Sequence, residues 1–403
     1  MTEGQIANID LVKQVNAAAV YRIIDQQGPV SRIQIADICQ LAPASITKIT
    51  RQMLEHGLIR EEALLESTGG RRAIALVAEQ QRFQFISCRL GRKSVHIGLY
   101  NLAAKELARI EQPLTERERE PVIASLKSAL ECFIASHKKQ INQLIGLAVT
   151  LPGLVNPESG EVLYMPSLSL AGSPLASELE THFKLPTFIG NDTRSLALAE
   201  HFFGASRDCQ DSILVSVHNG TGAGIISKGK VLLGQNRNVG EIGHIQVERF
   251  GRRCQCGNFG CLETIVSNPA ILERTRELLT RGHVSLLDPA ALDIESLCSA
   301  ANRGDPLACE VIRQTGEYLG QTIAIMVNLF NPQKVLLAGE IVAAQKVLIP
   351  AIQRCVEHQS LPSFHAGLPI EPAAFQSQAT MGGVALIKRA LLEGDLLQRM
   401  MEM

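Results

Sequence analysis

The feature that most constrains how this chain folds is a cluster of potential metal ligands. His244 is followed by Cys254, Cys256 and Cys261, which gives one imidazole and three thiols in a short stretch. This is the number and softness of ligands that tetrahedral structural zinc favours. Two glycines between the second and third cysteines would let the backbone turn tightly around an ion. The spacing therefore predicts a structural Zn²⁺ site; the alternative is a set of reduced cysteines that fill a core.

Length and composition predict a globular protein with more than one domain. The chain has 403 residues, too many for one ordinary core, and 46% of them are hydrophobic. A formal net charge of −1 excludes a body that is basic throughout, so any DNA binding must be local. The sequence shows neither a long uncharged apolar run nor a signal-peptide pattern, so we expect a cytoplasmic protein.

The first eighty residues have the pattern of a winged helix-turn-helix. Helical spacing of apolar residues predicts a helix over 10–26, which Gly28-Pro29 ends. Ser31 is placed to cap a short helix over 32–39, and a second helix is expected over 44–56. The wing would be two strands, over 58–65 and 72–77, joined across Gly69-Gly70.

DNA binding is predicted from the placement of polar and basic residues on these elements. The second helix of such a motif enters the major groove, and wing residues reach phosphate or the minor groove. Residues 1–82 carry nine cationic and nine acidic side chains, so the case rests on position rather than total charge. The alternative is a helical interaction module with a solvated charged face. The expected DNA-binding residues are Ser45, Thr47, Lys48, Arg51, Arg71 and Arg72.

After residue 82, strands alternate with helices, and the pattern is repeated after Ser212, which predicts an α/β body of two similar lobes. In open α/β sheets, ligands bind at the carboxyl ends of strands. Asn191 and Asp192 follow a short strand over 187–189, and a plain helix N-cap is the alternative reading of Asp192. A glycine-rich turn over 219–224 could cradle an anion with its backbone N–H groups, or be a bare hairpin turn.

Two adjoining motifs carry a family resemblance. Glu-Ile-Gly-His at 241–244 and Cys-x-Cys-Gly-x-x-Gly-Cys-Leu-Glu at 254–263 resemble the signature of the ROK family of sugar kinases and sugar-responsive repressors. The similarity runs from about Arg82 to the end of the chain. It implies an α/β fold in which a winged helix-turn-helix precedes a two-lobed actin/hexokinase-like ROK body that binds sugar between its lobes.

The resemblance also implies a division into domains. We expect a DNA-binding domain over 1–81 and a first lobe over 82–192, against which a C-terminal helix over 381–403 packs back. The second lobe would cover 193–380 and carry the zinc site and an oligomerisation surface.

The resemblance implies a protein without kinase activity. Kinases of the family carry Asp-x-Gly-x-Thr in a strand hairpin near the start of the body, and its Asp helps to hold the metal–nucleotide. The corresponding stretch, Cys88–Ser94, has no acidic residue. Phosphoryl transfer depends on a metal ion that neutralises developing charge, so this loss is serious. An active sugar kinase remains the rival, because Asn191 agrees with the kinases and Asp192 corresponds to their general base.

Residues 43–51 and 67–74 narrow the resemblance to repressors of amino-sugar genes. It implies a repressor of N-acetylglucosamine uptake and catabolism genes that binds palindromic operator DNA as a homodimer or homotetramer. N-acetylglucosamine 6-phosphate would release it from DNA. The alternative is a glucose-responsive repressor sequestered by a domain of a membrane sugar transporter. The residues expected to hold the sugar are Asn191, Asp192, Glu241, His244 and Glu263, with the phosphate at Thr221-Gly222.

Overall fold

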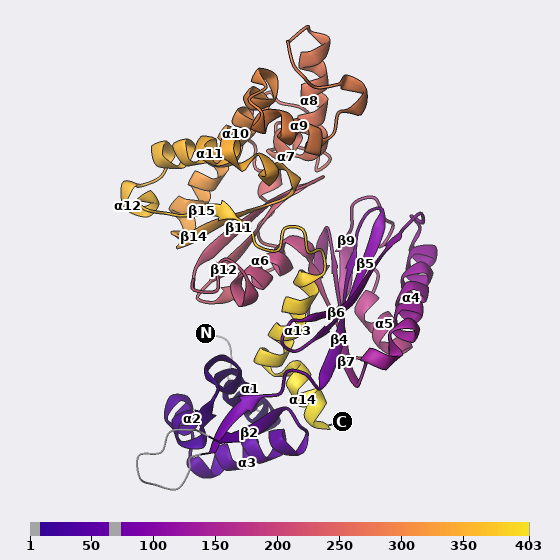
Figure 1. The fold of residues 1–403 in the computed structure, drawn as a ribbon, viewed down its shortest axis with the longest axis vertical. Coiled ribbons are helices and arrows are strands. Elements are labelled where there is room, and N and C mark those ends of the chain that lie inside the picture. Colours follow the sequence, from indigo (N-terminus) through magenta and orange to yellow (C-terminus); the bar gives the residue numbers. More distant parts are fainter. Residues whose placement is uncertain (1–8, 64–73, 403) are drawn as a thin grey trace. The chain divides into compact units, whose positions relative to one another are not determined.

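The computed structural model describes residues 9–63 and 74–402, which form two compact units (Figure 1). Of the described residues, the first unit comprises 9–63, 74–151, 158–189 and 383–402, and the second comprises Pro152–Pro157 and Gly190–Gly382. Residues 9–63 and 74–81 therefore belong to the same unit as the first sheet of the body. Asn191 and Asp192 lie in the second unit, whereas the sequence had placed them at the end of the first lobe. No helix in the described ranges is long and apolar enough to cross a membrane.

The amino-terminal elements have the order of a winged helix-turn-helix. Three helices precede and flank a three-stranded sheet of order β1-β3-β2. Ser31 caps α2 and exchanges hydrogen bonds with Gln34, as its place in the sequence predicted. The tip of the expected wing, with Arg71 and Arg72, lies outside the described residues. The elements are α1 (Ile9–Gln27), β1 (Val30–Ser31), α2 (Arg32–Cys39), α3 (Pro43–Glu55), β2 (Ile59–Ala63) and β3 (Ile74–Ala78).

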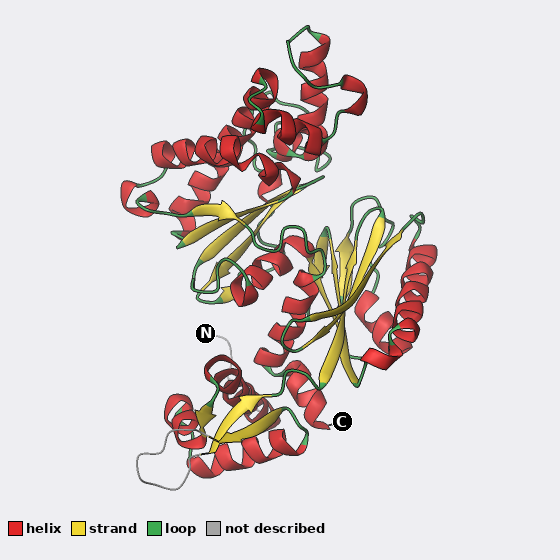
Figure 2. Cartoon of the chain, viewed as in Figure 1, coloured by secondary structure: helices red, strands yellow, loops and turns green. Residues whose placement is uncertain are grey.

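The first unit also contains a five-stranded sheet of order β10-β7-β4-β5-β6 (Figure 2). β4 pairs antiparallel with β5 and parallel with β7, so the sheet is mixed. β4 and β7 in its middle are almost continuously buried, as expected where helices cover both faces of a sheet, whereas every residue of the edge strand β6 is at least partly exposed. The elements are β4 (Phe83–Leu90), β5 (Ser94–Asn101), β6 (Glu106–Pro113), α4 (Arg119–Ser136), β7 (Gln143–Leu151), β9 (Glu161–Tyr164), α5 (Leu175–Phe183) and β10 (Thr187–Asn191).

The carboxyl-terminal segment forms two helices, not the single helix predicted over 381–403. α13 (Met381–Glu393) and α14 (Asp395–Glu402) are separated by Gly394, whose φ of +96° ends the first helix. Lys388 pairs with Asp25 of α1 at 2.5 Å, and Arg399 pairs with Glu180 of α5 at 2.7 Å. These contacts hold both helices against α1 and α5 of the first unit.

The second unit is built on a sheet of order β13-β12-β11-β14-β15. β11 pairs antiparallel with β12 and parallel with β14. Ile213, Val215 and Val217 of β11 belong to the hydrophobic core that α10 also enters. The strands are β8 (Leu154–Asn156), β11 (Ser212–Val217), β12 (Thr221–Ser227), β13 (Lys230–Val231), β14 (Lys334–Ala338) and β15 (Ile370–Pro372). The helices are α6 (Asp192–Phe203), α7 (Glu263–Val266), α8 (Asn268–Thr280), α9 (Ile294–Asn302), α10 (Pro306–Phe330), α11 (Gln345–Gln359) and α12 (Pro362–His365).

The glycine-rich turn predicted over 219–224 is shorter in the structure. β12 begins at Thr221, which lies opposite Val217, so Gly222 and Gly224 belong to the strand. A Cβ at Gly224 would lie 2.4 Å from the Cβ of Ala197 in α6. The absence of a side chain at Gly224 therefore allows α6 to pack closely on the sheet.

Candidate ligand site, metal cluster and DNA-facing helix

The structure brings the four predicted metal ligands together. Nδ1 of His244 lies 3.6 Å from Sγ of Cys254, and Sγ of Cys256 lies 3.7 Å from Sγ of Cys261. All four ligand atoms lie within 4.8 Å of one another. Two sulfurs bound tetrahedrally at about 2.3 Å from one zinc ion would lie about 3.8 Å apart, so the spacing suits a single ion.

The backbone around the cluster explains why the sequence needs glycine there. Gly260 has a φ of +65°, and a Cβ on it would lie 1.7 Å from the carbonyl oxygen of Glu248. The N–H of Val247 donates to the carbonyl of Gly260, and the N–H of Cys254 donates to that of Asn258. These contacts fold the loop back on itself and fix where each sulfur lies.

The thiols of the cluster differ in how readily they ionise. Burial, followed by hydrogen bonds with Cys256 and Cys254, raises the pKa of the Cys261 thiol to about 12. Burial also raises the pKa of Cys254, whereas a backbone hydrogen bond from Asn258 lowers that of Cys256. Thiols with raised pKa values become ligands when a divalent cation displaces their protons. The cluster therefore has the composition and geometry of a group that could bind a metal ion.

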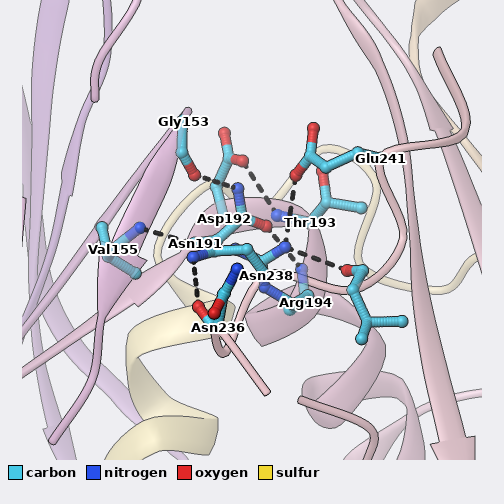
Figure 3. Close-up of polar contacts among 10 residues, drawn as sticks. Gly153, Val155, Asn191, Asp192, Thr193, Arg194, Asn236, Asn238 and Glu241 are labelled. Atoms are coloured by element: carbon cyan, nitrogen blue, oxygen red, sulfur yellow. Dashed lines mark hydrogen bonds and ion pairs between the residues drawn. The ribbon is translucent and has the colours of Figure 1, made fainter. Parts of the chain in front are cut away.

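Asn191, rather than Asp192, caps the amino terminus of α6. Its Oδ1 accepts from the backbone N–H of Arg194 at 3.0 Å, and its Nδ2 donates to the carbonyl of Gly153 at 2.9 Å (Figure 3). Both ends of the Asn191 amide are thus engaged in holding the backbone. Asp192 is half-buried, and its Oδ1 accepts from the N–H of Thr193 at 2.8 Å. The plain N-cap role weighed for Asp192 therefore belongs to its neighbour.

Two further acidic residues of the predicted site are fixed by hydrogen bonds within the second unit. Glu241 accepts from the guanidinium of Arg194 at 3.3 Å (Figure 3), and its side chain stays 40% exposed. Glu263 accepts from the N–H of Thr221 at 3.0 Å. That N–H was expected to bind a ligand phosphate, but a carboxylate of the chain already holds it here. The buried Oγ1 of Thr221 has no partner among the described residues.

No role at the site was predicted from the sequence for Arg194 or Asn238. A signal was available for Arg194, because a cation in the first turn of a helix is opposed by the helix dipole and needs acceptors nearby. Its acceptors are the carbonyl of Val239, the carboxylate of Glu241 and the amide oxygen of Asn238. The segment 236–241 has no comparable local pattern, since its contacts depend on residues more than forty positions away.

A second charged cluster lies where β11 and β14 end. Oε2 of Glu340 accepts from Nδ1 of His218 at 2.7 Å and from Nδ2 of Asn268 at 2.8 Å. Burial opposes ionisation of this carboxyl, but the hydrogen bond and charge of His218 and the hydrogen bond of Asn268 lower its pKa to about 2. Glu340 therefore puts a negative charge at the carboxyl ends of two parallel strands, the usual place for ligands of open α/β sheets.

The helix expected to face DNA presents the predicted side chains to solvent. α3 buries Ile46, Thr50 and Met53, and its other residues are exposed, apart from the half-buried Ile49 and Leu54. Arg32 of α2 is less free to contact DNA, since its guanidinium donates to Thr50 and pairs with Glu61 at 2.8 Å. The exposed predicted residues of α3 are Ser45, Thr47, Lys48 and Arg51.

Comparison with known proteins places this fold and site in a family. Residues 85–390 match the model of the ROK family, and the chain belongs to that family. It is 54% identical over 400 residues to the DNA-binding transcriptional dual regulator NagC of Escherichia coli K12, covering 99% of this chain and 98% of NagC. It is 41% identical over 404 residues to the transcriptional repressor Mlc of the same organism, covering 100% of both chains.

A solved structure extends the comparison to three dimensions. The crystal structure of a ROK family transcriptional regulator, a homologue of the E. coli Mlc protein, superposes with a TM-score of 0.92. It is 44% identical in sequence and covers 97% of this chain and 100% of the other. The similarity includes the amino-terminal elements as well as both units of the body.

Proposed function

We propose that the protein is a sugar-responsive transcriptional repressor of N-acetylglucosamine uptake and catabolism genes. The observation that carries this is the 54% identity to NagC over nearly the whole of both chains. The exposed polar and basic face of α3, in a winged helix-turn-helix order, supports binding in the major groove of operator DNA. A palindromic operator calls for a symmetric reader, so the active form is a homodimer or homotetramer.

N-acetylglucosamine 6-phosphate is the proposed inducer. Asp192, Glu241, His244 and Glu263 would bind ring hydroxyls and the 2-substituent, and Asn191 would hold the backbone beside them. The phosphate is proposed to lie at Thr221-Gly222. Because the Thr221 N–H donates to Glu263, binding there requires the Glu263 carboxylate to move away. Ligand entry would thus be coupled to a rearrangement at the start of α7.

The metal ion of the Cys₃His cluster is proposed to be structural Zn²⁺. Soft thiolates and imidazole in a closed four-ligand set favour zinc over harder cations. Nδ1 of His244 points to Cys254, which leaves Nε2 to donate to a sugar hydroxyl. Metal binding would in this way fix the orientation of a ligand-binding ring.

The protein is proposed to have no kinase activity. The β4–β5 hairpin contains no acidic residue over 88–94, so the carboxylate that helps to hold the metal–nucleotide in the kinases has no counterpart there. A second candidate function, a glucose-responsive repressor captured by a membrane transporter domain, is favoured by the 41% identity to Mlc.

Thermal unfolding with a panel of sugars tests the proposal. N-acetylglucosamine, its 6-phosphate, glucosamine 6-phosphate and glucose 6-phosphate are each added at matched concentrations, with and without Mg-ATP. At 100 times its Kd a ligand adds about 2.7 kcal/mol, a readable shift in the unfolding midpoint. A shift with N-acetylglucosamine 6-phosphate alone supports the proposal. Stabilisation by a free sugar that grows with Mg-ATP indicates a kinase, and no shift at all favours a protein partner as the signal.

A further inference from the structure

A buried arginine lies beside the predicted sugar-binding carboxylates. Arg194, in the first turn of α6, is 5% exposed. Its Nη1 donates to the carbonyl of Val239 at 3.0 Å and to Glu241 at 3.3 Å, and its Nη2 donates to Asn238 at 2.9 Å (Figure 3). All of these acceptors lie on one segment, 236–241, which carries Glu241 into the site.

The position is costly for a cation. The positive end of the helix dipole opposes it, and burial lowers the pKa of the guanidinium, while the charge and hydrogen bond of Glu241 raise it. A buried charge of this kind is held only where its partners are fixed, and here the two terminal nitrogens donate to a carbonyl, a carboxylate and an amide oxygen. The arginine is thus a strong constraint on the segment that it binds.

The same network reaches a third segment of the chain. The backbone N–H of Val155 donates to Oδ1 of Asn238 at 3.3 Å, and Asn191 binds both the carbonyl of Gly153 and the N–H of Arg194. Figure 3 shows these residues meeting around the first turn of α6. Residues 153–155, the helix and the 236–241 segment are therefore held as one group with Arg194 near its centre.

The charge of Arg194 bears on which sugars the site accepts. Asp192, Glu241 and Glu263 bring three carboxylates to the predicted site, and a phosphorylated sugar would add further negative charge. The charges of Glu241 and Asp192 both act on the Arg194 guanidinium, so the arginine offsets them in turn. Removing this cation would leave an uncompensated carboxylate close to an anionic ligand.

We propose that Arg194 is a positioning residue that orients Glu241 and makes the site selective for an anionic, phosphorylated sugar over the neutral one. The inference rests on the proposed sugar-binding function. Its geometric basis is the set of three guanidinium hydrogen bonds to segment 236–241, and its electrostatic basis is the offset of the neighbouring carboxylates.

Isothermal titration of the full-length protein with N-acetylglucosamine 6-phosphate and with N-acetylglucosamine tests this. Arg194→Met should weaken binding of the phosphosugar about tenfold more than binding of the neutral sugar, equivalent to about 1.4 kcal/mol of selectivity. Arg194→Lys keeps the charge but not the planar fork, so both affinities should fall while most of the selectivity remains. Arg207→Met, which removes an exposed cation from the same unit, is the matched control and should leave both affinities unchanged.

A second pair of variants keeps the test decisive if Arg194→Met does not fold. Glu241→Gln in the otherwise unchanged protein should raise the preference for the phosphosugar, and in the Arg194→Met background it should restore selectivity. The inference would be overturned if every Arg194 variant bound both sugars equally more weakly and Glu241→Gln left the ratio of the two affinities unchanged. Arg194 would then have only a structural role. If the unaltered protein binds neither sugar, the proposed function itself fails, and this inference fails with it.

Discussion

At the scale of single residues, the neighbouring polar side chains of Asn191 and Asp192 differ in burial and in the contacts that they make. Asn191 is buried, and its amide holds both the first turn of α6 and the carbonyl of Gly153. Asp192 remains half-buried at the start of the helix. In the sequence either residue suits an N-cap, because both types favour that position. Only the folded backbone decides which of the two side chains turns inward.

Substitutions at these two residues should therefore separate stability from ligand binding. Asn191→Ala should lower the free energy of unfolding by about 1–2 kcal/mol, through loss of the cap and of the link to Gly153. Asp192→Asn should change stability by less than about 0.5 kcal/mol but weaken sugar binding. Urea unfolding and calorimetric titration measure the two effects. Equal loss of stability in both variants would contradict this division.

Glu340 gives the protein a pH dependence in acid. Its folded-state pKa of about 2 lies below its ordinary value of 4.5, so its ionised form stabilises the fold above pH 4.5. This contribution is lost as the pH falls through the interval from about 4.5 to about 2. Glu340→Gln should therefore flatten the fall of the unfolding midpoint over that interval. Its half-exposed side chain will keep the effect small. Parallel midpoint curves for the two proteins would show that Glu340 does not ionise differently on folding.

At the scale of elements, local patterns in the sequence predicted some boundaries well and missed others for identifiable reasons. The helix predicted over 32–39 is α2 with the same bounds, because its cap at Ser31 and its capping box are local. The break at Gly394 was missed because apolar spacing continues through it. The early start of β12 was missed because pairing with β11, rather than local composition, determines it. The Arg194 network depends on distant residues, as strand pairing does.

The metal loop is the element for which loss of one side chain should have the largest effect. Cys256→Ala removes a ligand, so we expect metal content measured by mass spectrometry to fall and the unfolding midpoint to drop by several degrees. A change of 1 kcal/mol shifts the midpoint by about 2–4 °C in a domain of about 150–250 residues. Cys132→Ala, at an exposed free cysteine of α4, is the control and should change neither quantity. Retained metal together with an unchanged midpoint would refute the four-ligand site.

At the scale of the whole molecule, the proposed DNA-binding residues belong to the first unit and the proposed sugar-binding residues to the second. The chain passes from the second unit to the first between Gly382 and Gly383, within α13. The same helix ends on α1, where Lys388 pairs with Asp25 and Arg22 donates to the carbonyl of Leu392. A coupling free energy of about 1–3 kcal/mol between the two functions would give a strong response.

The division between units predicts that DNA binding can be lost alone. Lys48→Ala and Arg51→Ala should each weaken binding to a DNA duplex that the protein has selected from a random library. Each lost phosphate contact should also reduce the slope of the logarithm of the binding constant against the logarithm of salt concentration by about one. Titration with N-acetylglucosamine 6-phosphate should be unchanged. Lys139→Ala, at an exposed lysine of the first unit far along the chain from α3, serves as the control. Joint loss of DNA and sugar binding would contradict the separation of the two functions.

The position of His244 would link the metal cluster to the proposed sugar response. Nδ1 of its ring lies 3.6 Å from Sγ of Cys254, and Glu241 lies three residues before it on the same short segment. If the ion is needed to orient this ring, a cell short of zinc would make a repressor that still binds DNA but no longer detects its inducer. The genes under its control would then stay repressed even when their sugar is plentiful. The supply of zinc would therefore decide whether the cell can respond to the sugar.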